Sequence, residues 1–134
     1  MIECWQKPLN WGPTLEEIKE KYGEVSARCL PYDYRSIKLF GFTIMNFIGD
    51  CGSLYIQGAN NATYENLRKL INFASEGGWS KIFATVVTDE PEKAKEAFKK
   101  AQFKKVSEGK SNRNPHKTDI VYVKVIKNCE YKGY

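Results

Sequence analysis

Six residues in the second half of the chain, Ile82-Phe83-Ala84-Thr85-Val86-Val87, form an uncharged, largely apolar run, and Thr88-Asp89-Glu90-Pro91 follows directly. A short continuous run of this kind is typical of a strand that is buried on both faces. We therefore predict a strand over residues 82–87 in the interior of a sheet. The next four residues supply capping oxygens, acidic side chains and a proline, which a helix accepts in its first turn. A helix is predicted to begin near Pro91.

Helical periodicity also precedes this strand. Leu67, Leu70, Ile71 and Ala74 recur at the spacing of one helix face, and Gly77-Gly78 ends the pattern. The sequence therefore predicts a helix that connects two strands of one sheet, in the right-handed sense usual for such crossovers.

The chain after Pro91 is expected to close the sheet. The predicted buried positions of its helix are Ala94, Ala97, Phe98 and Ala101. A strand over 103–107, a polar turn over 108–117 and a strand over 119–127 should follow.

The first half predicts one helix and several antiparallel strands. Thr14 and Glu17 have the spacing of a capping box, and Gly23 is placed to end a helix over 15–22. Three segments rich in β-branched and aromatic residues are expected to be strands, at 35–40, 42–48 and 52–57. The predicted fold class is α/β (α+β), a mixed central sheet of about six or seven strands flanked by helices.

Length and composition indicate one folded domain over residues 1–134, with a lead segment at 1–13 and a loose tail at 128–134. The 134 residues suffice to bury a core, and 42% hydrophobic with 28% charged residues argues against disorder. Because the chain has neither a run long enough to span a membrane nor a signal-peptide pattern, a cytoplasmic location is expected.

The cysteines indicate neither a metal site nor a redox pair. The four are scattered without a CxxC motif and His116 is the only histidine, so no zinc ligand set is predicted. Four cysteines could form two disulfides, but without an export signal we expect free, mostly buried thiols at all four positions. They are Cys4, Cys29, Cys51 and Cys129. The net charge of +5 modestly favours an anionic partner such as coenzyme A or nucleic acid.

The segment Ala97-Phe98-Lys99-Lys100-Ala101-Gln102-Phe103, with the order of elements around it, resembles the C-terminal half of the GCN5-related N-acetyltransferase (GNAT) superfamily. The resemblance covers about residues 52–127. The stretch from Leu39-Phe40-Gly41-Phe42 to Cys51-Gly52 also resembles short acetyltransferase-like proteins of tailed bacteriophages. The resemblance implies an acyl-coenzyme A dependent N-acyltransferase that acts on an amine, with acetyl-coenzyme A as cofactor. A phage-encoded member would work in the host cytoplasm or the virion.

The same resemblance implies a pyrophosphate site at the turn before the helix near Tyr64, where helix amides would meet the anion. The family's glycine pair is absent from this turn, so a plain helix-capping turn is the alternative. The implied cofactor-binding residues are Leu54, Tyr55, Ile56, Gln57, Gly58, Ala59, Asn60, Asn61, Ala62 and Thr63.

The catalytic prediction remains open. Phe98 stands where many family members carry a tyrosine that protonates the leaving thiolate, and phenylalanine cannot donate a proton. Tyr55, Tyr122 and Cys51 are candidate replacements. Two alternatives to an acyltransferase are a non-catalytic structural or interaction protein of the same fold, such as a phage virion or host-takeover component, and a transferase that modifies DNA bases.

Overall fold

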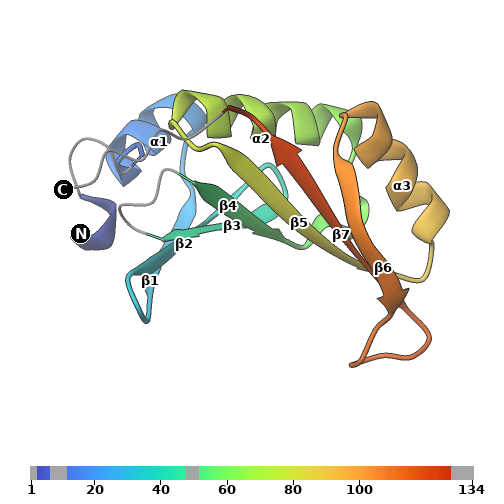
Figure 1. The fold of residues 1–134 in the computed structure, drawn as a ribbon. Helices are drawn as coiled ribbons and strands as arrows, with labels where there is room; N and C mark the ends of the chain where they lie inside the picture. Colours follow the sequence, from blue (N-terminus) through green and yellow to red (C-terminus); the bar gives the residue numbers. More distant parts are fainter. Residues whose placement is uncertain (1–2, 7–11, 48–51, 128–134) are drawn as a thin grey trace.

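The computed structural model describes residues 3–6, 12–47 and 52–127, which form a sheet with helices on one side (Figure 1). The helical elements are η1 (Glu3–Trp5), α1 (Leu15–Tyr22), η2 (Ala59–Asn61), α2 (Tyr64–Glu76) and α3 (Pro91–Lys100). The strands are β1 (Ser26–Leu30), β2 (Tyr34–Leu39), β3 (Phe42–Phe47), β4 (Ser53–Gln57), β5 (Lys81–Thr88), β6 (Lys104–Lys110) and β7 (Thr118–Val125). No helix in these ranges is long and apolar enough to cross a membrane.

The seven strands form one mixed sheet in the order β1-β2-β3-β4-β5-β7-β6. Neighbouring strands are antiparallel except β4 and β5, which are parallel. The predicted fold class is thereby confirmed, including the crossover through α2 and the position of β5 between two neighbours.

The crossover helix α2 forms because its sequence fixes both ends and one face. The Thr63 hydroxyl caps the first turn by accepting from the amide of Asn66 at 3.1 Å. Leu67, Leu70, Phe73 and Ala74 are buried against the sheet. The helix ends at Gly77, where a Cβ would lie only 2.1 Å from the Trp79 ring, so glycine is required by the close approach of that buried indole.

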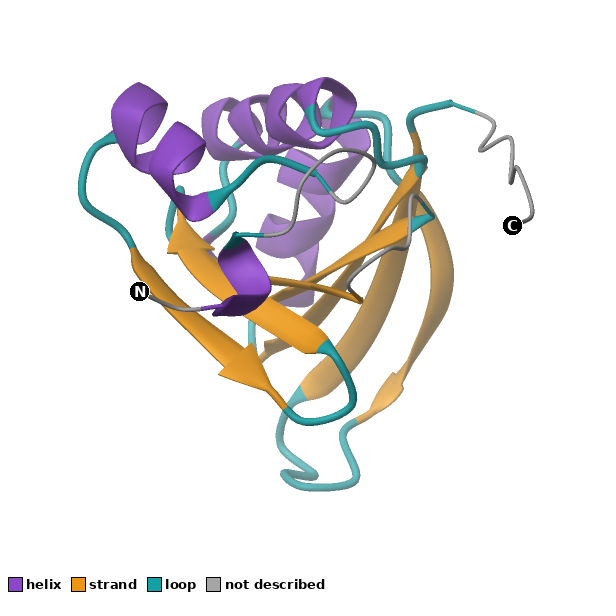
Figure 2. Cartoon of the chain, turned by 90° about the vertical axis from the view of Figure 1, so that its left-hand side faces the viewer, coloured by secondary structure: helices purple, strands orange, loops and turns teal. Residues whose placement is uncertain are grey.

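The two faces of the sheet have different environments, which corrects the prediction that residues 82–87 are buried on both faces. Ile82, Ala84 and Val86 are fully buried beneath the helices, whereas Lys81 and Thr85 on the opposite face are exposed. A view turned by 90° shows the helices gathered on one side of the curved sheet (Figure 2). The absence of charge in residues 82–87 fits the central position of β5 in the sheet. The helices nevertheless cover only one of the two faces of this strand.

Two larger differences from the sequence prediction are an additional strand and a longer β6, while the ends of the other predicted strands agree within two residues. Strand β1 was not anticipated, because Ser26-Ala27-Arg28-Cys29-Leu30 lacks a clear alternation and takes its conformation from pairing with β2. Strand β6 extends to Lys110, so the turn before β7 spans 111–117 rather than 108–117. Its continuation comes from pairing with β7, where Lys110 lies opposite Thr118.

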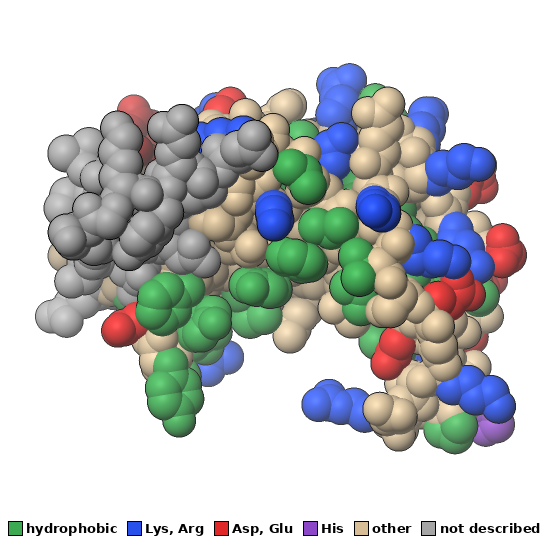
Figure 3. All heavy atoms as spheres, in the orientation of Figure 1, with side chains coloured by type: hydrophobic (Ala, Val, Ile, Leu, Met, Phe, Trp, Pro, Cys, Tyr) green, Lys and Arg blue, Asp and Glu red, His purple; other side chains and the backbone are tan. Residues whose placement is uncertain are grey.

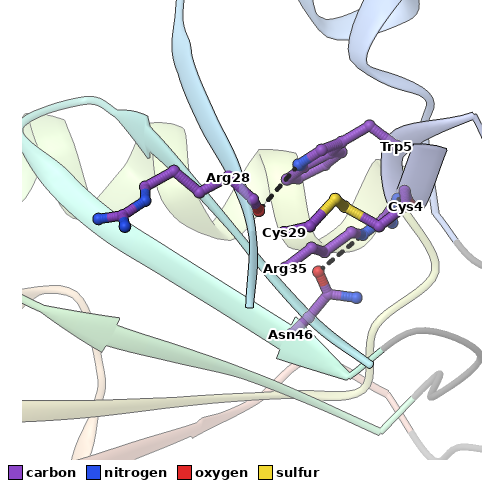
Figure 4. Close-up of a disulfide and its surroundings, with 6 residues drawn as sticks. All are labelled: Cys4, Trp5, Arg28, Cys29, Arg35 and Asn46. Atoms are coloured by element: carbon purple, nitrogen blue, oxygen red, sulfur yellow. Dashed lines mark hydrogen bonds between the residues drawn. A yellow bond between two sulfur atoms is a disulfide. The ribbon is translucent and has the colours of Figure 1, made fainter. Parts of the chain in front are cut away.

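The lead segment is attached to the sheet by a disulfide, contrary to the expectation of free thiols at Cys4 and Cys29. These residues are bonded with their Cα atoms 5.9 Å apart, a normal distance for a disulfide (Figure 4). Sequence spacing could not reveal this pair, because only the folded sheet brings η1 beside β1. Cys51 and Cys129 lie outside the described residues.

The buried Arg35 of β2 lies under this disulfide and holds the lead segment through its guanidinium. Its Nε donates to Asn46 Oδ1 at 3.1 Å, its Nη1 donates to the Cys4 carbonyl at 3.3 Å, and its guanidinium carbon lies 4.2 Å from the Trp5 ring centroid (Figure 4). Burial lowers the pKa of Arg35 to about 10, so the side chain remains charged at neutral pH. Trp5, only 2% exposed, therefore packs on a cation that the sheet presents.

Breaking the Cys4–Cys29 disulfide should destabilise the protein. The bond closes a loop of sequence separation 25, for which chain entropy predicts a loss of about 3–4 kcal/mol on reduction. Urea unfolding with and without reductant measures this loss, with the Cys4→Ala/Cys29→Ala variant as the control that should respond much less. An equal response of both proteins would contradict the assignment.

Phe98 should contribute strongly to stability. Its fully buried ring stacks on Tyr122 with centroids 4.2 Å apart and meets Phe103 edge-on at 5.2 Å, as expected from the predicted buried face of this helix. We expect Phe98→Ala to lower the free energy of unfolding by about 3–5 kcal/mol. Phe98→Leu should lower it less, because leucine fills more of the space left by the ring. A loss below about 1 kcal/mol for the alanine variant, measured by urea unfolding, would show that the ring is not packed in this way.

Candidate functional site

The candidate site lies where β4 and β5 separate. Their parallel pairing runs from Ser53 opposite Lys81 to Ile56 opposite Ala84 and stops there. Strand β5 continues through Thr88 and remains paired with β7 on its other side. Within the described part of the chain, residues 85–88 therefore have no strand partner on the β4 side, and a short opening begins beyond Ile56.

The turn that follows β4 occupies the start of this opening. Gly58 adopts a left-handed conformation with φ of 76°, and Ala59 is fully buried. This places Asn60 beside β5, where its Oδ1 accepts from the Val87 amide at 3.2 Å. One amide side chain thus replaces the missing strand partner, and the opening between β4 and β5 is confined to the region around this contact.

The start of α2 adjoins the opening and carries positive electrostatic potential. Tyr64 and Glu65 hold the first two helical positions, whose amides have no carbonyl partner within a helix. Lys100, at the end of α3, places its Nζ 4.8 Å from the Tyr64 ring centroid. The one acidic residue of the first turn, Glu65, faces Lys69 at 3.8 Å. Helix dipole and lysine together favour an anion here.

The residues predicted to bind a cofactor divide between two sides of the sheet. Leu54 and Ile56 are buried beneath the helices. Tyr55 and Gln57 lie exposed on the opposite face of the sheet, which the helices leave uncovered and which we call the open face. Gly58, Asn60, Asn61 and Thr63 are exposed in the turn, Ala62 is half-buried and Ala59 is buried. The turn and the two outward-facing residues of β4 remain candidates for contact with a ligand.

The structure does not bring the predicted catalytic residues together. Tyr55 is 41% exposed on the open face and stacks on Phe83. Tyr122 is 3% exposed and lies under α3 on the opposite face, in register with Ala84. Cys51 lies outside the described residues. Of the two described candidates, only Tyr55 has a side chain accessible to a ligand.

Tyr122 is nevertheless an unusual buried group. Its hydroxyl oxygen has no hydrogen-bond partner, and burial raises the pKa of the phenol while the charge of Lys95 opposes the change. Lys95 itself pairs with Glu108 at 3.0 Å and with Glu92 at 3.2 Å. This ion cluster lies on the helix side of the sheet, where its charges act on the phenol without a hydrogen bond to it.

A pocket of about 270 Å³ lies at the other end of α2. Its lining includes Ile18 and Tyr22 of α1 and Phe73 and Gly77 at the end of α2, and a Lys21–Glu76 ion pair lies beside it. Because α2 has 13 residues, this pocket is about 18 Å along the helix from Tyr64. The pocket and the opening beside β4 are therefore separate features.

The described residues contain no cluster of three or more potential metal ligands, and His116 is exposed in the turn after β6.

Sequence reasoning missed two features of the site. The role of Lys100 has no local sequence signal, because nothing near it in the chain indicates that the end of α3 reaches the start of α2. Asn60 was named for the cofactor turn, but its bond to Val87 depends on a residue 27 positions away.

No protein-family model and no curated protein matches the chain. Among solved structures, the aminoglycoside 6'-N-acetyltransferase from Enterococcus faecium overlaps with a TM-score of 0.46 at 12% identity, covering 88% of this chain and 82% of that one. An aminoglycoside 6'-acetyltransferase type Ii overlaps with a TM-score of 0.46 at 13% identity, covering 86% of this chain and 78% of that one. Overlap at this level identifies neither a substrate nor a reaction.

Removing the Tyr122 hydroxyl should not destabilise the protein. The group is buried without a partner, so Tyr122→Phe abolishes a desolvation cost of about 1–3 kcal/mol while it retains the stack on Phe98. We expect equal or higher stability in urea unfolding, whereas Tyr122→Leu, which loses the stack, should be less stable. If Tyr122→Phe lost more than about 1 kcal/mol, the hydroxyl would have to make a bond in solution.

Proposed function

We propose that the protein is an acyl-coenzyme A dependent N-acyltransferase of GNAT type, acting on an amine. The observation that carries the proposal is the end of the β4–β5 pairing at Ile56 and Ala84, directly beside the start of α2. An opening between two parallel strands exposes backbone groups to an extended polar chain, and the adjoining helix start favours a phosphate. The pantetheine arm and pyrophosphate of coenzyme A combine these two chemistries.

The residues around the opening are compatible with the pyrophosphate. A Cβ added to Gly58 would meet nothing within 4 Å, so the backbone there is approachable. The amides of Tyr64 and Glu65 and the ammonium group of Lys100 would supply hydrogen-bond donors and positive charge. Pantetheine could occupy the strand opening only if Asn60 released the Val87 amide, which would then be free to donate to an amide of the ligand.

In this proposal, the chain contributes binding and orientation, and Tyr55 is the candidate proton donor. Bound acyl-coenzyme A supplies an activated acyl group as a thioester. Tyr55 lies one residue before the end of the pairing, on the open face, so its phenol could approach a leaving thiolate. Phe98 is fully buried and has no proton to donate, and Tyr122 is enclosed, so neither fits this role as the structure stands.

A non-catalytic protein with the same fold is the second candidate function. The Asn60–Val87 hydrogen bond, which occupies the opening, and the buried Phe98 favour it. A phage structural or host-takeover component would be an example of this second candidate. A location in the host cytoplasm or the virion would fit either candidate. Coenzyme A binding separates the two.

Coenzyme A should stabilise the protein against heat. A ligand at one hundred times its dissociation constant stabilises by about 2.7 kcal/mol, so acetyl-coenzyme A should raise the melting temperature in a saturable manner. Lys100→Gln should raise the dissociation constant several-fold, because it removes a charge beside the α2 start. Lys93→Gln is the matched control, since Lys93 is an exposed lysine of the same helix, two turns earlier.

The choice of Lys100 avoids the residues of the turn itself. Gly58 is left-handed and Ala59 is fully buried, so bulky substitutions there would disturb the fold as well as the ligand site. If millimolar acetyl-coenzyme A left the melting temperature unchanged, the acyltransferase proposal would fail. If it bound but Lys100→Gln and Lys93→Gln behaved alike, coenzyme A would bind somewhere other than the start of α2.

A further inference from the structure

The open face of the sheet carries a continuous row of side chains across all seven strands. The cross-strand partners in this row are Arg28, Ser36, Met45, Tyr55, Phe83, Val123 and Lys104, in order from β1 to β6. Directly opposite residues point to the same face, so the row has an apolar and aromatic middle with a cation at each end. Six strand spacings give it a length of about 29 Å.

Aromatic rings are partly exposed along this face. Tyr55 and Phe83 lie parallel with centroids 5.6 Å apart and planes inclined by 14°. Tyr34 and Phe47, cross-strand partners on the same face, meet edge-on at 5.3 Å and are 37% and 39% exposed. Hydrophobic side chains form a band between two projecting hairpins, the β1–β2 and β6–β7 turns (Figure 3).

The tip of the first hairpin adds another exposed ring. Tyr32 has a left-handed backbone, with φ of 63°, and is 88% exposed. A bulky residue in this conformation is uncommon, and here the turn holds an aromatic ring out in solvent at the edge of the open face. An exposed aromatic array of this kind suits partners with flat apolar surfaces.

Four cations lie exposed around the aromatic row. Arg28, Lys38, Lys81 and Lys104 are exposed on the open face by strand register. No carboxylate among the described residues forms an ion pair with any of the four. On the described strands of this face the one acidic residue is Asp119, opposite Val87 and two rows from Tyr55. The described strands therefore carry an excess of positive charge on the open face.

We propose that this open face binds single-stranded nucleic acid. Unpaired bases would stack on the Tyr55–Phe83 platform, and the phosphate backbone would pass the four unpaired cations. A duplex fits poorly, because its bases are stacked inside and cannot reach the rings. The inference does not depend on coenzyme A, whose proposed phosphate site is at the start of α2.

The charge pattern argues against a second copy of the chain as the occupant. A two-fold contact through this face would place the same cationic surface against itself. The two ends of the aromatic row are both basic, so neither relative orientation of two rows pairs a cation with a carboxylate. A polyanion neutralises both ends.

Fluorescence anisotropy with a labelled 15-nucleotide oligothymidylate and a duplex of the same length tests this proposal. Four phosphate contacts predict a slope of about −3 in log affinity against log salt, equivalent to about a 50-fold loss between 50 and 200 mM KCl. Lys81→Gln should make the slope shallower by about 0.7, and the duplex should bind at least tenfold more weakly. Lys93→Gln removes the same charge from α3 on the helix side and should leave the slope unchanged.

The aromatic contribution is tested separately at one salt concentration. Tyr55→Ala should weaken binding by about 5- to 150-fold, whereas Tyr55→Phe retains a stacking ring and should bind within about twofold of the unchanged protein. Equal binding by both variants, or no preference for the single strand over the duplex, would reduce the interaction to general charge attraction and overturn the proposal. Absence of binding at 50 mM KCl would also overturn it, and a dimer in sedimentation that Tyr55→Ala dissociates would then assign the face to a second copy. The assay contains no coenzyme A, so its failure leaves the acyltransferase proposal unaffected.

Discussion

The parallel pairing of β4 with β5 is the constraint on which the rest of the structure depends. Because two parallel strands cannot be joined by a tight turn, α2 must cross over the sheet between them, and its face of Leu67, Leu70 and Phe73 then covers that side. The antiparallel strands β3, β2 and β1 attach to one side of this unit, and β7 with β6 attaches to the other. The pairing is also short, and the place where it ends creates the candidate site.

The two sides of the sheet consequently offer different chemistry. On the helix side, the core of the sheet is covered by apolar residues, and the Tyr122 hydroxyl is buried among them. On the open side, aromatic rings and cations without carboxylate partners remain accessible. The opening beside α2 lies between these two environments. A ligand there could place its anionic end at Lys100 and its reactive end near Tyr55, on the same open face as the aromatic row.

The lead segment shows how a few contacts from a distant part of the chain complete the core. Trp5 packs on the buried Arg35, and the disulfide joins η1 to the edge strand β1 (Figure 4). Burying a charged guanidinium is costly unless it forms hydrogen bonds, and the Asn46 side chain and the Cys4 carbonyl accept hydrogen bonds from Arg35. The edge of the sheet that carries Arg28 is thereby held in place.

The sequence by itself determined the elements whose patterns are local. The helices 15–22 and from Pro91, the crossover ending at Gly77, and the central position of β5 all follow from caps, glycines and apolar spacing within a few residues of one another. The tertiary structure decided the features that join distant residues. These are the Cys4–Cys29 bond, the edge strand β1, the placement of Lys100 at Tyr64 and the bond from Asn60 to Val87. It also decided that β5 has one open face, because alternation along a strand predicts two faces but not which of them the helices cover. The physical reason is that patterns within a few residues determine the local backbone conformation. Contacts between residues far apart in the sequence depend on how the helices and strands pack against one another.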